Sequence, residues 1–253
     1  MAGLGPLLRK ELLEQWRTLR LPVIATIFLL VGLSSPLLAR FTPEILKSVA
    51  GNQFSITLPT PTAADAVDQL AKNLGQFGGL IAVLLAMGAV ASEKERGTAA
   101  LLLTKPVSRA AFLGAKLVAI GLTLAVSVAI ATAGAWFYTL VLFQALPVGG
   151  VAAGAVLQWL TLIAWASITF VGSTLTRSSL AAAGIGIVAF IVVGILGVLP
   201  GIGAWLPTGL GGPARALALG IPGPDPVGPV LATVGLIAGA GLVAWLAFRR
   251  QEL

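Results

Sequence analysis

The sequence contains no cysteine and no histidine among its 253 residues. Without cysteine the chain forms no disulfide and offers no thiol nucleophile. Without either residue it lacks the usual ligand sets for zinc, copper and haem, and the imidazole of a Ser-His catalytic site. It also lacks the GxxxxGK[ST] phosphate loop of Walker-type nucleotide sites. We therefore expect no catalytic residues, no metal and no cofactor on this chain, and no enzymatic activity.

Charged residues are scarce as well. Only 10% of the residues are charged and 57% are hydrophobic, whereas a soluble globular chain is about one quarter charged. This composition indicates an integral membrane protein, and the 31 glycines suit helices that pack closely in lipid. The formal charge of +7 follows the loops on one side of the membrane, so it predicts a topology and no nucleic-acid partner.

Six apolar runs are each long enough to cross a hydrocarbon core of about 30 Å. Residues 117–176 contain no charge, which leaves room for two spans joined by a turn at 147–150. The predicted fold is an all-α integral membrane protein with six transmembrane helices in a single domain, 1–253. The predicted spans are 21–38, 75–92, 117–142, 151–175, 180–199 and 227–248.

The connections between the spans carry their own patterns. Residues 1–20 are basic and amphipathic, as in a helix that lies in the membrane interface. In the outer segment 39–74, Thr62 and Asp65 predict a capping box for a short helix that leads into the second span. After the fifth span, Pro200 to Pro207 break the helix while staying apolar, which predicts a re-entrant or interfacial segment on the outer side.

The positive-inside rule sets the orientation. With residue 1 inside, 12 of the 16 lysine and arginine residues lie on the cytoplasmic side, so both termini are predicted to be cytoplasmic in the cell membrane. By this layout no charged residue falls in the middle of a span. Since proton and sodium coupling rely on such groups, energy for uphill transport would have to come from another chain.

The most informative stretch is 93–116, which holds seven charged residues in 24 positions. Its interior, 99–103, is a short apolar patch between Gly97 and Pro106. A short helix with an apolar patch in a polar frame suits docking into a cleft on a soluble partner. An ordinary cytoplasmic loop, whose charges only fix the topology, is the alternative, and the spacing does not decide between them.

The segments Glu93-Lys-Glu-Arg-Gly-Thr98, Leu101-Leu102 and Lys105-Pro-Val-Ser-Arg109, followed by Lys116, resemble the signature of ABC-2 type permeases, the membrane subunits of ABC transporters. The resemblance implies a coupling helix at 93–116 that docks on a separate cytosolic ABC ATPase, present in two copies and carrying ATP and Mg²⁺. It also implies an N-terminal elbow helix, a second permease subunit in a homodimer, export as the direction of transport, and a prokaryotic cell. The implied ATPase-contact residues are Glu93, Glu95, Arg96, Gly97, Thr98, Leu101, Leu102, Pro106, Ser108 and Arg109, and the elbow residues are Arg9, Glu14, Trp16 and Arg17.

The resemblance also implies individual roles. Glu95 and its neighbours would contact the ATPase or tie the coupling helix to the elbow, and Gly97 would permit a turn out of the second span. Thr98 would cap the coupling helix, Pro106 would end it, and Arg109 would pair with an acidic group of the partner. Two other functions stay open at this point: a secondary transporter or channel that acts alone, and a membrane scaffold that recruits a soluble protein through residues 93–110.

Overall fold

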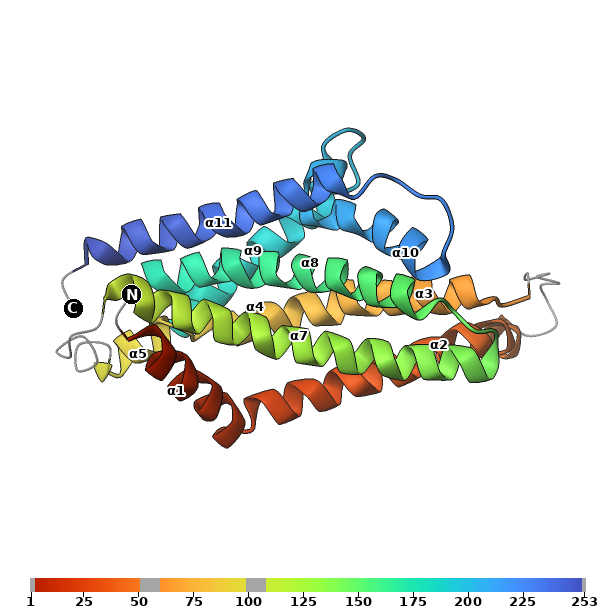
Figure 1. Ribbon diagram of the computed structural model, residues 1–253, viewed down its shortest axis with the longest axis horizontal. Coiled ribbons are helices and arrows are strands. Elements are labelled where there is room, and N and C mark those ends of the chain that lie inside the picture. Colours follow the sequence, from red (N-terminus) through yellow and green to blue (C-terminus); the bar gives the residue numbers. More distant parts are fainter. Residues whose placement is uncertain (1–2, 51–59, 99–107, 252–253) are drawn as a thin grey trace.

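The computed structural model describes residues 3–50, 60–98 and 108–251. Every regular element in these ranges is a helix. Six helices or helical runs in this part of the chain are long and apolar enough to cross a membrane, and they lie side by side in one elongated bundle (Figure 1). The predicted all-α membrane fold with six spans is confirmed.

The helix that contains the first span is longer than the predicted span. Helix α1, Leu4–Arg17, is followed by α2, Arg20–Ala50, whereas the expected span ended at 38. Pro36 and Pro43 both lie inside α2, because a membrane helix tolerates proline where neighbouring groups satisfy the freed carbonyls. The 31 residues of α2 measure about 46 Å at 1.5 Å per residue, so one end extends beyond the hydrocarbon core.

The second span is one helical run of several parts. It consists of α3, Ala63–Asn73, a π-helical turn η2, Leu74–Gly78, then α4, Gly79–Met87, and α5, Ala91–Glu95. The predicted cap at its start is present: the backbone N–H of Thr62 donates to the Asp65 carboxylate over 2.7 Å. The short outer helix therefore continues directly into the span, through a π-helical turn that the sequence did not predict.

The third and fourth spans are the centre of the bundle. They are α7, Arg109–Leu142, and α8, Val148–Leu175. The turn between them ends at Pro147, so Gly149 and Gly150 belong to α8 and not to the turn as predicted. Gly150 is needed for packing, because a Cβ atom there would overlap the carbonyl oxygen of Leu217.

The last third of the chain begins with α9, Ser179–Leu196. The broken segment after it forms two 3₁₀ turns, η3, Gly203–Trp205, and η4, Pro207–Leu210, and then α10, Gly211–Leu219. Leu210 and Ala214 of this segment are buried against Leu157 of α8. The final span is α11, Val227–Arg249.

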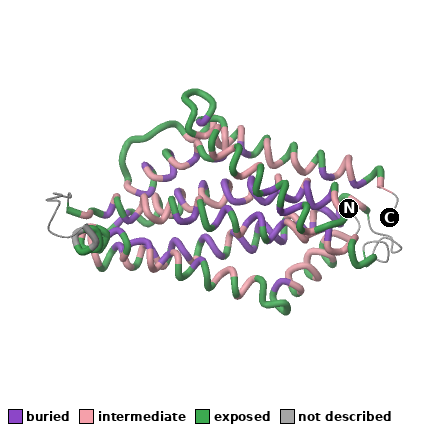
Figure 2. Tube along the Cα trace, turned by 180° about the vertical axis from the view of Figure 1, so that it is seen from behind, coloured by how far each residue is buried: buried purple, intermediate pink, exposed green. Residues whose placement is uncertain are grey.

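The main hydrophobic core lies among α2, α4, α7 and α8, around residues such as Phe28, Leu124, Leu162 and Phe170. Figure 2 shows the buried residues along these central helices and exposed ones along the outer helices. Among the six spans, α9 and α11 have the smallest buried shares. Their exposed leucine, isoleucine and valine side chains are compatible with a lipid environment.

Only some of the glycines bring helices close together. Gly235 and Gly239 of α11 are spaced as a GxxxG pair, but a Cβ atom at either would meet nothing within 4 Å. Gly32 of α2 instead lies against the backbone of Ala131 in α7, where a Cβ atom would overlap the carbonyl group. A single glycine thus sets the approach of α2 to α7.

We predict that Gly32→Leu lowers the free energy of unfolding by about 1–3 kcal/mol, because the side chain forces the two backbones apart. Thermal unfolding in detergent micelles measures the change. The matched control is Gly239→Leu, whose side chain enters open space and leaves the melting temperature near the wild-type value. Equal melting temperatures for the two variants would contradict this packing.

Candidate functional site

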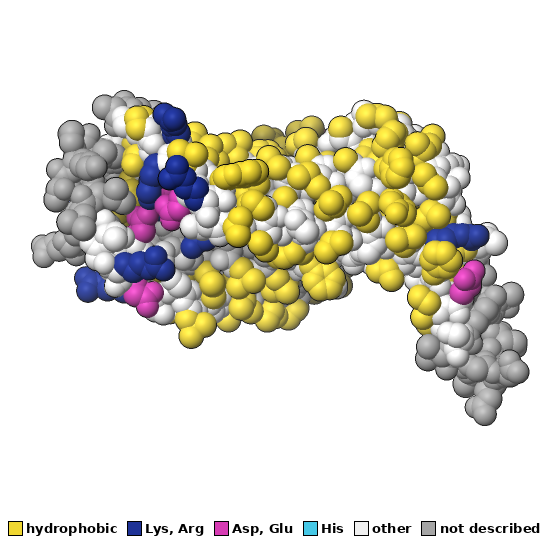
Figure 3. Space-filling view, turned by 90° about the horizontal axis from the view of Figure 1, so that it is seen from below, with side chains coloured by type: hydrophobic (Ala, Val, Ile, Leu, Met, Phe, Trp, Pro, Cys, Tyr) yellow, Lys and Arg dark blue, Asp and Glu magenta, His cyan; other side chains and the backbone are white. Residues whose placement is uncertain are grey.

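Charged side chains gather at one end of the molecule, while its flank is mostly apolar (Figure 3). We call this end the termini end, because α1, α5 and the last turn of α11 meet there (Figure 1). Two groups of side chains at the termini end hold the two ends of the segment 93–109, which is part of the stretch 93–116 that the sequence analysis identified as the most informative.

The first group is an ion cluster of five residues: Lys10, Glu11, Glu14, Glu93 and Lys116. The Lys116 Nζ lies 2.7 Å from Glu93 Oε1 and 3.1 Å from Glu11 Oε1. The Lys10 Nζ lies 3.0 Å from Glu11, 3.3 Å from Glu93 and 3.1 Å from Glu14. The cluster therefore joins α1, α5 and α7.

Lys116 is the buried centre of this cluster, with 4% of its side chain exposed. A buried charge is stable only when paired and hydrogen-bonded, because removal from water costs several kcal/mol. The two carboxylates meet that requirement, and one comes from α1 and the other from α5. Gln15 of α1 adds a buried hydrogen bond to Thr123 of α7, so α1 is tied to the bundle on both sides of Glu14.

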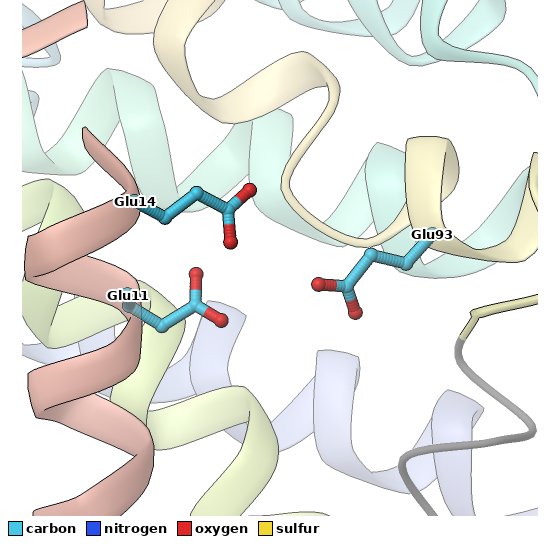
Figure 4. Close-up of side chains that lie close together, drawn as sticks. All are labelled: Glu11, Glu14 and Glu93. Carbon is cyan, nitrogen blue, oxygen red and sulfur yellow. The ribbon is translucent and has the colours of Figure 1, made fainter. Parts of the chain in front are cut away.

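The three carboxylates converge from two elements, Glu11 and Glu14 from α1 and Glu93 from α5 (Figure 4). Carboxylate oxygens of the three residues lie within 4.8 Å of one another, as in some metal sites. Here the ammonium groups of Lys10 and Lys116 lie within ion-pairing distance of the same carboxylates. The arrangement is an ion-pair network whose positive charges come from the chain itself.

The network shifts proton affinities in α1. Partial burial alone would lower the pKa of Lys10, but hydrogen bonding and charge from Glu11, and the charge of Glu93, raise this pKa above its ordinary value. Partial burial would raise the pKa of Glu14, but its hydrogen bond to Lys10 and the positive charges of Lys10, Lys116 and Arg20 together outweigh this and lower the pKa below 4.5. Both groups are charged at neutral pH.

The second group, which we call the α11 clamp, consists of Lys94, Arg109, Thr174, Phe248 and Gln251. The Arg109 guanidinium donates to the carbonyls of Phe248 over 2.9 Å, Arg249 over 2.8 Å and Gln251 over 3.2 Å. Lys94 and the Gln251 amide both donate to the carbonyl of Thr174 at the end of α8.

Both cations of the α11 clamp lie near the aromatic ring of Phe248. The Lys94 Nζ is 5.5 Å from the ring centroid and the Arg109 Cζ is 5.9 Å from it, within the range of cation–π attraction. The last carbonyls of a helix have no partner within the helix, and cations are favoured there. Both ends of the segment 93–109 are therefore fixed to the ends of spans.

The predicted contact residues divide into three sets. Glu93 and Arg109 are engaged within the chain. Five residues are exposed: Glu95, Arg96, Gly97, Thr98 and Ser108. Leu101, Leu102 and Pro106 lie outside the described residues.

Gly97, Thr98 and Ser108 shape the ends of the segment. Gly97 has a φ of +70°, a left-handed conformation that glycine adopts without strain, and turns the chain after α5. The Thr98 hydroxyl donates to the carbonyl of Glu93 over 3.2 Å. The Ser108 hydroxyl accepts from the N–H of Ala111 over 3.1 Å and caps α7.

The predicted elbow residues lie on α1. Arg9, Trp16 and Arg17 are exposed, with Trp16 60% exposed, while Glu14 belongs to the ion cluster. Figure 1 shows α1 at an angle to α2. Leu19, with a φ of +59°, makes the turn between the two helices.

The sequence analysis missed the side-chain amides. Gln15 bonds to Thr123, Asn73 donates to Ser35 over 2.9 Å, and Gln251 bonds to Thr174. Each amide links two helices. The signal was available in the sequence, because an amide within or next to an apolar helix needs a partner when it is buried.

We predict that Lys116→Met destabilises the protein by about 3 kcal/mol, because it leaves two buried carboxylates with only a half-exposed partner. The double variant Lys116→Met/Glu93→Gln should recover part of this loss, as thermal unfolding in micelles measures. The control Lys10→Met removes a cation that is 40% exposed and should cost less than about 1 kcal/mol. Equal losses from the two lysine variants would contradict the buried-centre assignment.

The lowered pKa of Glu14 predicts acid sensitivity. The pKa of Glu14 in the folded state lies below 4.5. The charged Glu14 therefore stabilises the folded protein above this pH, and its stabilising contribution is lost as the pH falls through the folded-state pKa. Between about pH 7 and about pH 3, wild type should lose more thermal stability than Glu14→Gln. Glu44→Gln, an exposed carboxylate of α2, should keep the wild-type pH dependence, and an unchanged profile in Glu14→Gln would refute the contribution.

Comparison with known proteins places the chain in a family. The family model described as ABC-2 family transporter protein matches residues 6–208. The uncharacterized transmembrane protein YxlG of Bacillus subtilis (strain 168) is 29% identical over 206 residues, which are 79% of this chain and 79% of that protein. The matched residues run from α1 into the broken segment after α9 and include the whole of the segment 93–109. The chain therefore belongs to the ABC-2 family of transporter membrane proteins.

Proposed function

We propose that this chain is the permease subunit of an ATP-driven ABC transporter and that the segment 93–109 receives the motion of a cytosolic ATPase. The observation that carries the proposal is the anchoring of both ends of this segment. Glu93 is held by α1 and α7, Lys94 by the end of α8, and Arg109 by the end of α11. A loop passes a displacement to the spans only if its ends are fixed to them.

The contacts within the chain refine which residues meet the partner. The resemblance implied Glu93 and Arg109 as ATPase contacts, but their charged groups are engaged inside the permease. We assign these two residues to anchoring. The exposed Glu95 and Arg96, together with the stretch 99–107, are the proposed ATPase contacts.

The remaining parts of the proposal are what the resemblance to ABC-2 type permeases implies. The termini end faces the cytoplasm, and two ATPase subunits carry ATP and Mg²⁺. A second copy of this chain completes the translocation path, and transport is outward, across the cell membrane of a prokaryote. Membership of a transporter family favours this function over a scaffold.

We predict that Glu95→Arg abolishes co-purification of the ATPase subunit from native membranes in mild detergent. Leu102→Asp, in the apolar patch of the segment, should do the same. The matched control is Glu44→Arg, an equal charge reversal at an exposed position of α2 near the opposite end of the bundle, and it should keep the ATPase bound. Retention of the ATPase by Glu95→Arg and Leu102→Asp would refute the docking residues, and its absence from wild type would refute the transporter proposal.

A further inference from the structure

A cavity of about 380 Å³ opens on the side of the bundle, away from the termini end. Its walls come from the second span around η2, from α8 and α9, and from η4 and α10. This volume lies within the range of about 300–1,000 Å³ found for ligand sites. Neither the ion cluster nor the α11 clamp contributes a residue to it.

One part of the cavity lining is charged. Asp68, Lys72 and Arg215 line it, and the Arg215 Nε lies 2.5 Å from Asp68 Oδ1. The two charges of this ion pair cancel. Lys72 is exposed and forms no ion pair with the described residues, so the residues that line the cavity carry one excess positive charge that could attract a ligand.

Apart from the polar Gln158, Thr161 and Thr208, the rest of the lining is apolar. Trp165 of α8 and Phe190 of α9 meet edge to face with ring centroids 4.9 Å apart, and Pro207 adds a further apolar surface. Gln158 of α8, seven residues before Trp165, also lines the cavity, so the lining extends about 10 Å along this helix. The cavity therefore combines a charged part with an apolar part.

Three glycines from three elements leave the cavity open: Gly75 in η2, Gly194 in α9 and Gly211 at the start of α10. A Cβ atom at any of them would meet nothing within 4 Å. In contrast, Gly78 and Gly79, one turn beyond Gly75, are packed against Leu162 and Phe190. The π-helical turn that contains Gly75 is itself a feature enriched at functional sites.

We propose that this cavity is a binding site for an anionic phospholipid from the half of the bilayer opposite the termini end. An acyl chain would lie against Trp165 and Phe190, and the phosphate would lie near Lys72 and Arg215. A soluble anion would gain nothing from the aromatic surface, and a lipid with no net charge would gain less from Lys72. The inference goes beyond transport and does not depend on it.

The test uses the purified full chain in lipid nanodiscs with phosphatidylglycerol that carries a photoreactive group on its acyl chain. After irradiation, labelling of the peptide that contains Phe190 is measured by mass spectrometry, in parallel with a phosphatidylcholine probe of the same chain. Wild type should be labelled more strongly by phosphatidylglycerol. Lys72→Gln should lower this labelling about fivefold, toward the phosphatidylcholine level.

Gly194→Leu fills the cavity and should remove the labelling by either probe. Its matched control is Gly184→Leu, on the same helix, where a Cβ atom also meets nothing within 4 Å but which does not line this cavity. Equal melting temperatures establish that both variants fold. Labelling that persists in Gly194→Leu, or equal labelling of wild type by the two probes, would overturn the proposal.

Discussion

The burial of one ammonium group organises the termini end of this protein. Lys116 lies two turns inside α7 with 4% of its side chain exposed, and its charge is stable there only because Glu11 and Glu93 are brought to it. One carboxylate arrives on α1 and the other on α5. The helix before the first span and the end of the second span are thus fixed to the third by a single electrostatic requirement.

A second requirement comes from the bilayer, where polar groups must find partners within the protein. Hydroxyl groups bond back to their own helices, as Ser127 does to Thr123. Amides bond across helices, as Asn73 does to Ser35. At the end of α11, Arg109 donates to carbonyls that have no partner within the helix. In this way the same bonds that satisfy the backbone also hold the ends of the segment 93–109.

The second span connects the two proposed sites. Its helical run begins with the Thr62 cap, passes the cavity at Lys72 and Gly75, and ends at Glu93 in the ion cluster. The π-helical turn η2 interrupts the regular geometry beside the cavity and not at the termini end. The anchoring contacts and the lipid cavity therefore share one structural element while using none of the same side chains.

The sequence by itself determined the fold class, the six spans and the family, because these depend on the length of apolar runs and on a local pattern of charge. It also identified the Thr62 cap, which involves residues three apart. Only the tertiary structure decided that Glu93 and Arg109 turn into the chain. Glu93 pairs with Lys10 and Lys116, and Arg109 binds the end of α11, and these partners lie on other helices. The same holds for Gly32, whose role depends on Ala131, and for the cavity, which four separated segments build. Contacts between residues distant in sequence leave no local pattern, since each side chain alone is compatible with several partners.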